Sequence, residues 1–174
     1  MTMDLRRVVT GHDANGNAVV ILDGAPPVNN RAETGNAMAL IWSTDRAPAD
    51  NRGSEDAGNR QVPIAPAGGG STIRIVEYPP EGPNGPARDE RAHLKSLGGH
   101  VPEPPARHPG MHKTDSVDYA LILSGEIDML LDEDDVELST GDGVVERGSY
   151  RAWAGRGTAP CRIAFILIGA GPLP

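Results

Sequence analysis

The chain has 174 residues, of which 38% are apolar, and a formal net charge of -8. This length suits a single domain, and the acidic charge argues against nucleic acid as a partner because phosphate backbones repel it. No segment approaches the ~20 apolar residues of a membrane-spanning helix. The amino-terminal run MTMDLRRVV also lacks the apolar core of a secretory signal. We therefore expect a cytoplasmic protein that binds neither nucleic acid nor membrane.

Composition points to β structure. The 22 glycines and 16 prolines accompany short apolar runs, a combination that favours a turn-rich β protein over a helical one. Eleven Asp or Glu and no Lys or Arg occur between Asp115 and Glu146. We expect most of these acidic side chains to form a solvated face.

The amino-terminal part is expected to contain four strands. In chain order they are Leu5–Thr10, Ala18–Leu22, Ala37–Ser43 and Ser71–Tyr78. Asn15-Gly16 is a strong hairpin signal between the first two. Residues 44–70 are rich in Asp, Arg, Pro and Gly and show no apolar period, so we expect a long surface loop there.

An irregular arm is expected over residues 79–111. Its centre, Arg88–Leu97, suits a short helix that ends at Gly98. Long loops inside a compact domain are often functional, so the arm and residues 44–70 are candidates for a lid. His93 and His100 lie in the arm, and we expect both to be solvated unless the arm folds over the rest of the domain.

The last third of the chain carries a dense series of short strands. They are Val117–Leu123, Glu126–Leu131, Val136–Leu138, Gly143–Arg147, Tyr150–Trp153 and Arg162–Ile168. A turn signal stands between each pair. Six short antiparallel strands in succession favour a closed or sandwiched barrel, because such a barrel removes the exposed edges.

Two motifs in this region carry a resemblance. The first motif of the cupin superfamily, H-x-H-x3-4-E-x6-G, ends here at Gly125, and Asp118 stands at its glutamate position. His112 and Thr114 then stand at the two histidine positions. The glycine and the spacing match, whereas one of the two histidines and the glutamate are replaced.

The second cupin motif shows the same pattern. Gly141 opens it, Glu146 replaces its proline, and Gly148 is retained. Arg151 stands in place of the final histidine ligand, and Gly155 in place of the asparagine. The chain resembles a small single-domain cupin of the RmlC-like jelly-roll type with a degenerate metal-binding motif.

This resemblance implies the fold and the organisation of the chain. The expected fold is all-β, a cupin double-stranded β-helix (jelly-roll barrel) with extra N-terminal strands and long loops. One cupin domain would span 1–174, with N-terminal strands and a loop over 1–78, the arm over 79–111 and the motif core over 112–168. Cupins commonly pair through exchanged amino-terminal strands, so a homodimer is expected, with Leu5–Thr10 as the exchanged segment.

Strand alternation then predicts which side chains face the barrel interior. Side chains alternate along a strand, and a motif ligand must point inward. The positions that share this direction are His112, Thr114, Asp118, Ala120, Ile122, Arg151 and Trp153. The pocket is thus expected to hold an imidazole, a hydroxyl, a carboxylate, a guanidinium and an indole.

These residues favour a site without a metal. A cupin metal is normally held by three histidines and a carboxylate, and here only His112 and Asp118 remain. Arg151 stays protonated and opposes a nearby cation. We therefore expect no cofactor. A divalent metal is the alternative, with His108 as a third ligand.

The leading functional hypothesis is an enzyme of the lyase or isomerase type. His112 would move a proton, Asp118 would fix its tautomer and Arg151 would bind a carboxylate or enolate oxygen. Thr114, Ile122, Trp153 and His108 would contact a small carbonyl or carboxylate compound that undergoes dehydration, isomerisation, cyclisation or decarboxylation.

Three alternatives stay open at this point. Arg151 and Asp118 could form a buried ion pair that only replaces the structural role of the metal. The protein could be a metal-dependent dioxygenase or lyase that uses His112, Asp118 and His108. It could also be a module that binds a small ligand without catalysis.

Overall fold

The computed structural model describes residues 3–30, 35–82, 90–103 and 106–173, and β-strands dominate it. The elements are β1 (Arg7–His12), β2 (Ala18–Gly24), β3 (Val28–Asn30), β4 (Ala37–Thr44), β5 (Ser71–Tyr78), α1 (Glu90–Ser96), β6 (Ser116–Ser124), β7 (Glu126–Leu130), β8 (Asp135–Ser139), β9 (Gly143–Arg147), β10 (Ala152–Gly155) and β11 (Cys161–Gly169). The fold is mostly β with one short helix, as predicted.

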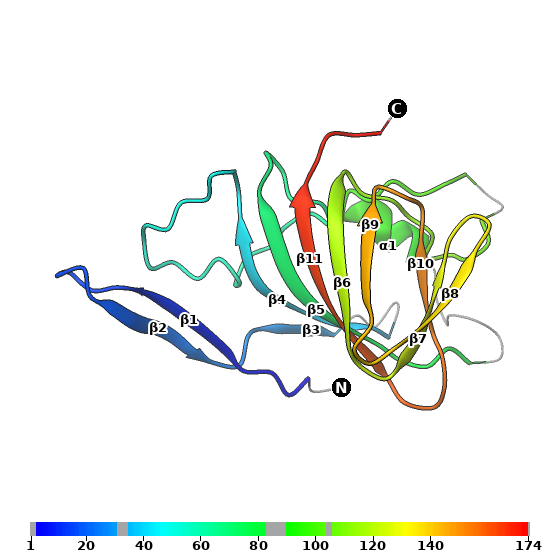
Figure 1. Ribbon diagram of the computed structural model, residues 1–174, viewed down its shortest axis with the longest axis horizontal. Helices are drawn as coiled ribbons and strands as arrows, with labels where there is room; N and C mark the ends of the chain where they lie inside the picture. The colour runs from blue at the N-terminus through cyan, green and yellow to red at the C-terminus, as the bar shows by residue number, and fades with distance from the viewer. Residues whose placement is uncertain (1–2, 31–34, 83–89, 104–105, 174) are drawn as a thin grey trace.

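Two antiparallel sheets face each other and form the barrel. The larger has the strand order β3-β4-β5-β11-β6-β9, and the smaller has the order β10-β7-β8. Figure 1 shows the larger sheet curving across the molecule, with the smaller sheet at its β6–β9 end. Strand β11 pairs with both β5 and β6, so it joins the amino-terminal strands to the carboxy-terminal third. This arrangement confirms the predicted double-stranded β-helix.

The main apolar core lies between the two sheets. On β6, Ala120 and Ile122 are at most 2% exposed, whereas the intervening Leu121 is 45% exposed. Trp153 from β10 meets Phe165 from β11 edge to face, with ring centroids 5.3 Å apart and an angle of 73° between the rings. The inward directions predicted for Ile122 and Trp153 are confirmed.

Three strands differ from the prediction. The expected strand Leu5–Thr10 lies two residues later, at Arg7–His12. The expected strand Tyr150–Trp153 begins later, at Ala152, because Arg151 forms an isolated backbone bridge with His112 instead of joining β10. Strand β3 was not predicted, since its three residues are too few to show a period of two.

The predicted helix in the arm is present and shorter than expected. It spans Glu90–Ser96, and the first two residues of the predicted range 88–97 lie outside the described residues. Gly98 has a φ of +79°, a backbone conformation that favours glycine. The amide of Gly99 donates to the carbonyl of Leu94 at 2.9 Å, which ends the helix.

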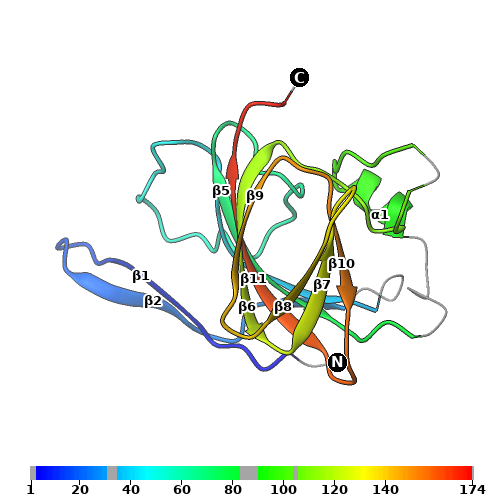
Figure 2. The ribbon, with the colours of Figure 1, turned by 45° about the vertical axis from the view of Figure 1, so that its right-hand side comes forward.

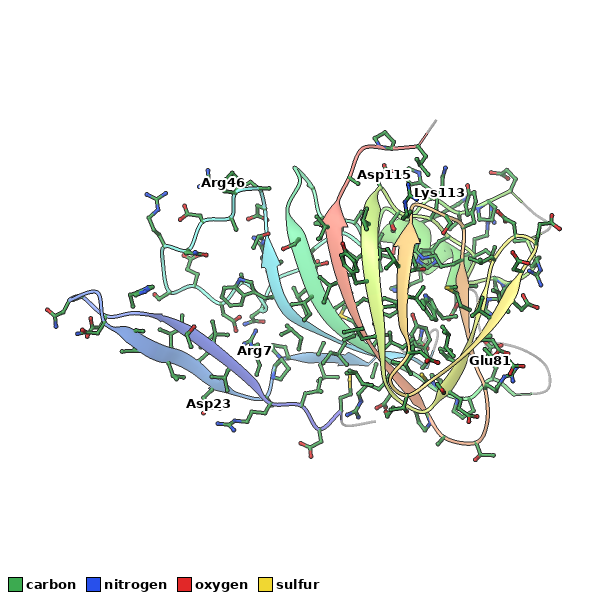
Figure 3. The ribbon with its side chains drawn as sticks, viewed as in Figure 1. Arg7, Asp23, Arg46, Glu81, Lys113 and Asp115 are labelled. Atoms are coloured by element: carbon green, nitrogen blue, oxygen red, sulfur yellow. The ribbon has the colours of Figure 1, made fainter. Side chains whose placement is uncertain are left out.

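The β1–β2 hairpin forms a separate two-stranded sheet that extends away from the barrel (Figure 1). Its base is tied to the loop after β4, because Arg7 donates to both carboxylate oxygens of Asp56 at 2.8 and 2.6 Å. Figure 3 shows Arg7 at this base. Val8 and Val20 are 48% and 58% exposed. Pairing with a second chain through Leu5–Thr10 stays a prediction.

The amino-terminal half of the larger sheet is packed on its outer face. Ala37 and Ala39 of β4 are at most 1% exposed, and they form a second apolar cluster with Met3. Residues 45–70 hold no strand or helix. The predicted loop 44–70 thus begins one residue later, because Thr44 is the last residue of β4. Within the described chain, no helix has the length and apolar character needed to cross a bilayer.

Candidate functional site

A buried ion cluster centred on Arg151 lies inside the barrel. Its Nη2 is 2.6 Å from Oδ2 of Asp118 on β6, and its Nε is 2.7 Å from Oε1 of Glu146 on β9. The side chain of Arg151 is 4% exposed, and those of the two carboxylates are 1% and 2% exposed. Burial at this level makes each charge depend on the others, because isolated charges are costly in an apolar interior.

Strand register explains why three charged groups meet. Asp118 and Glu146 are direct partners in the antiparallel β6–β9 pair, so their carboxylates lie side by side on the inner face and repel each other. Arg151 relieves this repulsion. Burial, opposed by Arg151 and reinforced by Asp118, raises the pKa of Glu146 to about 7.

The two carboxylates are held by different kinds of contact. Asp118 accepts a hydrogen bond from Nη2 of Arg151. The contact between Nε and Glu146 is close, but its geometry is not that of a hydrogen bond, and neither oxygen of Glu146 finds a hydrogen-bond partner. Glu146 is therefore the weakly satisfied member of the cluster, which is consistent with its raised pKa.

Thr114 completes the cluster. Its Oγ1 donates to Asp118 Oδ2 at 3.2 Å and accepts from Arg151 Nη2 at 3.1 Å. The hydroxyl of Ser116 donates to Thr114 Oγ1 at 2.9 Å. Thr114 faces inward as predicted, and its hydroxyl is occupied by these neighbours.

His112 lies beside the cluster and is joined to it through the backbone. The amides of His112 and Arg151 each donate to the carbonyl of the other at 3.0 Å. Nδ1 of His112 is 2.8 Å from the carbonyl oxygen of Gly110, which can only accept, so Nδ1 carries the hydrogen and Nε2 holds the lone pair. Burial and the charge of Arg151 lower the pKa of His112 to about 3. The imidazole is thus neutral at physiological pH.

His112 lines a small cavity of about 30 Å³, close to the volume of one water molecule. The lining residues are Tyr78, Glu90, His93, Leu94, Gly110, His112 and Trp153. Figure 2 shows α1, which supplies three of these residues, next to β10. A Cβ at position 110 would collide with Oε2 of Glu90. The carboxylate end of Glu90 thus lies against the backbone of Gly110.

The arm thus folds over the barrel, which decides between the two expectations for its histidines. His93 on α1 is only partly exposed and lines the cavity. His100 remains largely in solvent, with a side chain that is 53% exposed, and its Nε2 is 3.1 Å from Asp115 Oδ2. Figure 3 places Asp115 at the upper end of β6.

His108 is buried next to Gly110 and is fully engaged elsewhere. Its Nδ1 accepts the amide hydrogen of Gly110 at 3.0 Å, so its Nε2 carries the hydrogen that it donates to Glu81 Oε1 at 3.0 Å. Figure 3 shows Glu81 near the smaller sheet, and its amide donates to Gly155 of β10. Neither nitrogen of His108 is left to join His112 in a ligand set.

The side chains at the four cupin ligand positions do not fit a divalent metal. Only His112 and Asp118 are of ligand type, and the guanidinium of Arg151 already contacts the carboxylate that a metal would need. Within the described residues, no group of three or more His, Cys, Asp or Glu side chains is placed to hold a metal ion. The guanidinium of Arg151 already supplies a positive charge at this place.

The sequence missed several residues of the site. Glu146 shares the inward direction of Val144, but the adjacent Val145 is equally apolar, so alternation alone left the direction of this strand open. Glu90 and Tyr78 reach the cavity through the packing of the arm on the barrel and the end of β5. No local sequence signal marks those contacts.

Comparison with known proteins places the chain in a family. It is 31% identical over 179 residues to the phomopsin biosynthesis cluster protein C' of Diaporthe leptostromiformis, covering 96% of this chain and 79% of the relative. The chain belongs to the cupin superfamily. It is related to cupin-domain oxidoreductases of fungal biosynthetic clusters.

One further sequence relative and one solved structure are also similar to the chain. The chain is 27% identical over 176 residues to the cupin-domain-containing oxidoreductase virC of Hypocrea virens, covering 96% of this chain and 77% of the relative. The cupin domain of Schizosaccharomyces pombe Cnp3 aligns with a TM-score of 0.48 and 11% identity, over 94% of this chain and 87% of that one. No family model matches the chain.

Proposed function

We propose that the protein is a small-molecule enzyme that transfers a proton on a carbonyl or carboxylate compound without a bound metal. The observation that carries the proposal is that His112 is neutral and has a fixed tautomer. Its Nδ1 hydrogen is fixed on Gly110, and the ring lines the small cavity beneath α1. That cavity has room for about one water molecule, so in this proposal a substrate reaches the ring when α1 moves aside. A neutral imidazole of fixed tautomer is the usual form of a general base.

The Arg151 cluster gives this base a preference for anionic substrates. The charge of Arg151 is one cause of the low pKa of His112, so the empty site holds a weak base. A substrate carboxylate or a developing enolate beside the ring would offset that charge and raise the pKa of the imidazole. Proton transfer is then favoured when the intended kind of substrate is bound.

In this proposal, Arg151 and Asp118 act through their charges. Asp118 Oδ2 and Arg151 Nη2 are bonded to each other and to Thr114, whereas Asp118 Oδ1 and Arg151 Nε have no hydrogen-bond partner among the described residues. The backbone bridge to Arg151 positions His112, and the charges set the field around it. Trp153 and Tyr78 supply apolar walls that limit water near the reacting atoms. Dehydration, isomerisation, cyclisation and decarboxylation of a small oxygenated compound all fit these groups.

The relatives make redox chemistry the second candidate function. The name of virC describes an oxidoreductase, and an oxidoreductase would need an electron acceptor that reaches the same cavity. The two candidates differ in a measurable way, because only proton transfer exchanges a substrate hydrogen with solvent when no oxidant is added.

The test is deuterium exchange. The chain would be incubated in D2O, without oxidant, with a panel of small keto acids, hydroxy acids and β-dicarbonyl compounds, and deuterium next to the carbonyl would be followed by proton NMR. We expect exchange with at least one compound and a loss of about 100-fold or more in His112→Gln, the scale of general base catalysis. The control is His100→Gln, because His100 is exposed and lies outside the cavity.

Two results would contradict the proposal. Exchange that is equally fast in His112→Gln and in the unaltered protein would remove His112 from the reaction. Tight binding of a panel compound without any exchange would favour a non-catalytic binding module.

A further inference from the structure

A second and much larger hollow opens on the inner face of the larger sheet. It has a volume of about 970 Å³, in the range of ligand pockets in proteins. Strands β4 and β5 form its floor, the 58–63 segment one wall and the end of α1 another. No residue of the smaller sheet lines it, so it lies where the larger sheet extends beyond its partner (Figure 1).

This cleft is separate from the cavity at His112. The two hollows share no lining residue, although both touch the arm. Leu94 of α1 faces the small cavity, while Ser96, Leu97 and Gly98 border the cleft. The helix therefore stands between them.

The floor of the cleft combines apolar side chains with a buried charge. Met38 and Leu40 come from β4, and Arg74 comes from β5. Arg74 is 5% exposed, and its Nη2 donates to the carbonyl oxygens of Pro63 and Ile64 at 3.0 and 3.1 Å. These bonds fix the guanidinium in one place on the floor.

The wall adds a second guanidinium and two amides. Arg60 lines the cleft and forms an exposed ion pair with Asp45, with Nη2 2.6 Å from Oδ1. Asn59 and Gln61 flank it. Among the described residues, the lining contains two arginines and no Asp or Glu. The guanidinium of Arg60 donates to both carboxylate oxygens of Asp45, which lies outside the lining. Each of its two Nη groups keeps a second hydrogen that a ligand could accept.

We propose that this cleft binds an organic carboxylate with an apolar body, such as an aromatic or branched acid. The body lies on Met38, Leu40, Val62 and Leu97, and the carboxylate faces the two arginines, whose donors suit a planar anion. The proposal concerns a binding site apart from His112 and does not depend on proton transfer there.

The test is calorimetric titration with 2-naphthoate and its neutral counterpart 2-naphthamide. The unaltered protein is expected to bind naphthoate with one site per chain and at least about tenfold more tightly than naphthamide, as a charge-assisted contact requires. Equal binding of the two compounds, or no binding at millimolar concentration, would overturn the proposal.

A matched pair of variants locates the site. Asn59→Asp adds one negative charge to the lining, whereas Asn51→Asp adds the same charge to an exposed position of the same loop outside the lining. We expect Asn59→Asp to weaken naphthoate binding about fivefold or more, Asn51→Asp to change it less than about twofold, and neither to affect naphthamide. Both substitutions are on the surface, so folding is retained.

The opposite pattern would place the ligand elsewhere. If Asn59→Asp left the affinity for naphthoate unchanged while His112→Gln reduced it, the anion would bind in the barrel interior and the assignment of the cleft would be wrong.

Discussion

Two buried arginines lie on the inner side of this barrel, and their surroundings differ. Arg151 lies between Asp118 and Glu146 at the end that both sheets cover. Arg74 donates to the backbone carbonyls of Pro63 and Ile64 in the cleft beyond the smaller sheet. The same side chain thus serves as part of a closed charge cluster in one place and as part of a ligand-sized hollow in the other.

The difference shows that burial alone does not assign a role to a guanidinium. Around Arg151, two buried carboxylates contact the guanidinium, and none of these three side chains lines the small cavity at His112. Around Arg74, the lining combines apolar and amide side chains with a second arginine, Arg60, and the volume is about 970 Å³. The first surrounding suits control of the pKa of a neighbouring base, and the second suits recognition of an anion.

Removal of the charge at the closed end should have the largest effect. Arg151→Met leaves Asp118 and Glu146 buried together without a cation, and we expect the free energy of unfolding to fall by about 3–5 kcal/mol. Urea denaturation followed by circular dichroism measures it. The triple variant Arg151→Met, Asp118→Asn, Glu146→Gln should recover part of the loss. A loss below about 1 kcal/mol in the single variant would show that the two carboxylates do not depend on Arg151 as their buried counter-charge.

A second effect is a pH dependence that Glu146 carries. Its pKa is raised from 4.5 to about 7, so between these values the folded chain keeps a proton that the unfolded chain has released. Stability relative to Glu146→Gln should therefore fall as pH rises from 4.5 to 7, by an amount on the order of 3 kcal/mol. Urea denaturation at several pH values measures this difference, and a flat difference would contradict the raised pKa.

His112 contributes with the opposite sign. Its pKa is lowered from 6.5 to about 3, so between these values the unfolded chain binds a proton that the folded chain does not. Stability relative to His112→Gln should rise as pH increases from 3 to 6.5. The two contributions partly cancel in the unaltered protein between pH 4.5 and 6.5, and the single variants separate them.

The smallest effect on stability is expected outside the barrel, in the β1–β2 hairpin. A two-stranded sheet is marginal in water by itself, and exposed valines on it fit a contact with a second chain. Val8→Lys combined with Val20→Lys should convert a dimer into a monomer in light scattering while the barrel unfolds as before. Val145→Lys is the control, because Val145 is 59% exposed on β9 of the barrel. An unchanged molecular mass would show that the hairpin valines do not form a dimer contact.

Much of the barrel could be predicted because its signals are local. The turn glycines fix the strand ends. Alternation from Asp118 gave the correct inward direction for Ile122, and the ligand position in the second motif gave it for Arg151. The burial of Glu146 was not predicted, because Val144 and Val145 are both apolar and leave the direction of the strand open. Acidic residues in this region were also expected to be solvated. Its burial depends on a partner, Arg151, that is close in space rather than visible in the local pattern.

The position of the arm is a second feature that could not be predicted from the sequence. Its helix was predicted from local composition, but its position over the barrel follows from nonlocal packing, such as the space that Gly110 leaves for Glu90. The cleft is nonlocal in the same way. Leu40, Arg60 and Leu97 come from three separate parts of the chain, and nothing in the sequence brings them together.

The Arg151 cluster lies where a cupin would hold a metal, and we expect the barrel interior to bind none. Elemental mass spectrometry tests it directly on protein purified without chelator, incubated with zinc, iron or manganese and then passed through gel filtration. We expect far less than one metal per chain in the unaltered protein and a gain of zinc in Arg151→His, which replaces the guanidinium by a third ligand for His112 and Asp118. One metal per chain in the unaltered protein, lost in His112→Gln, would contradict the account.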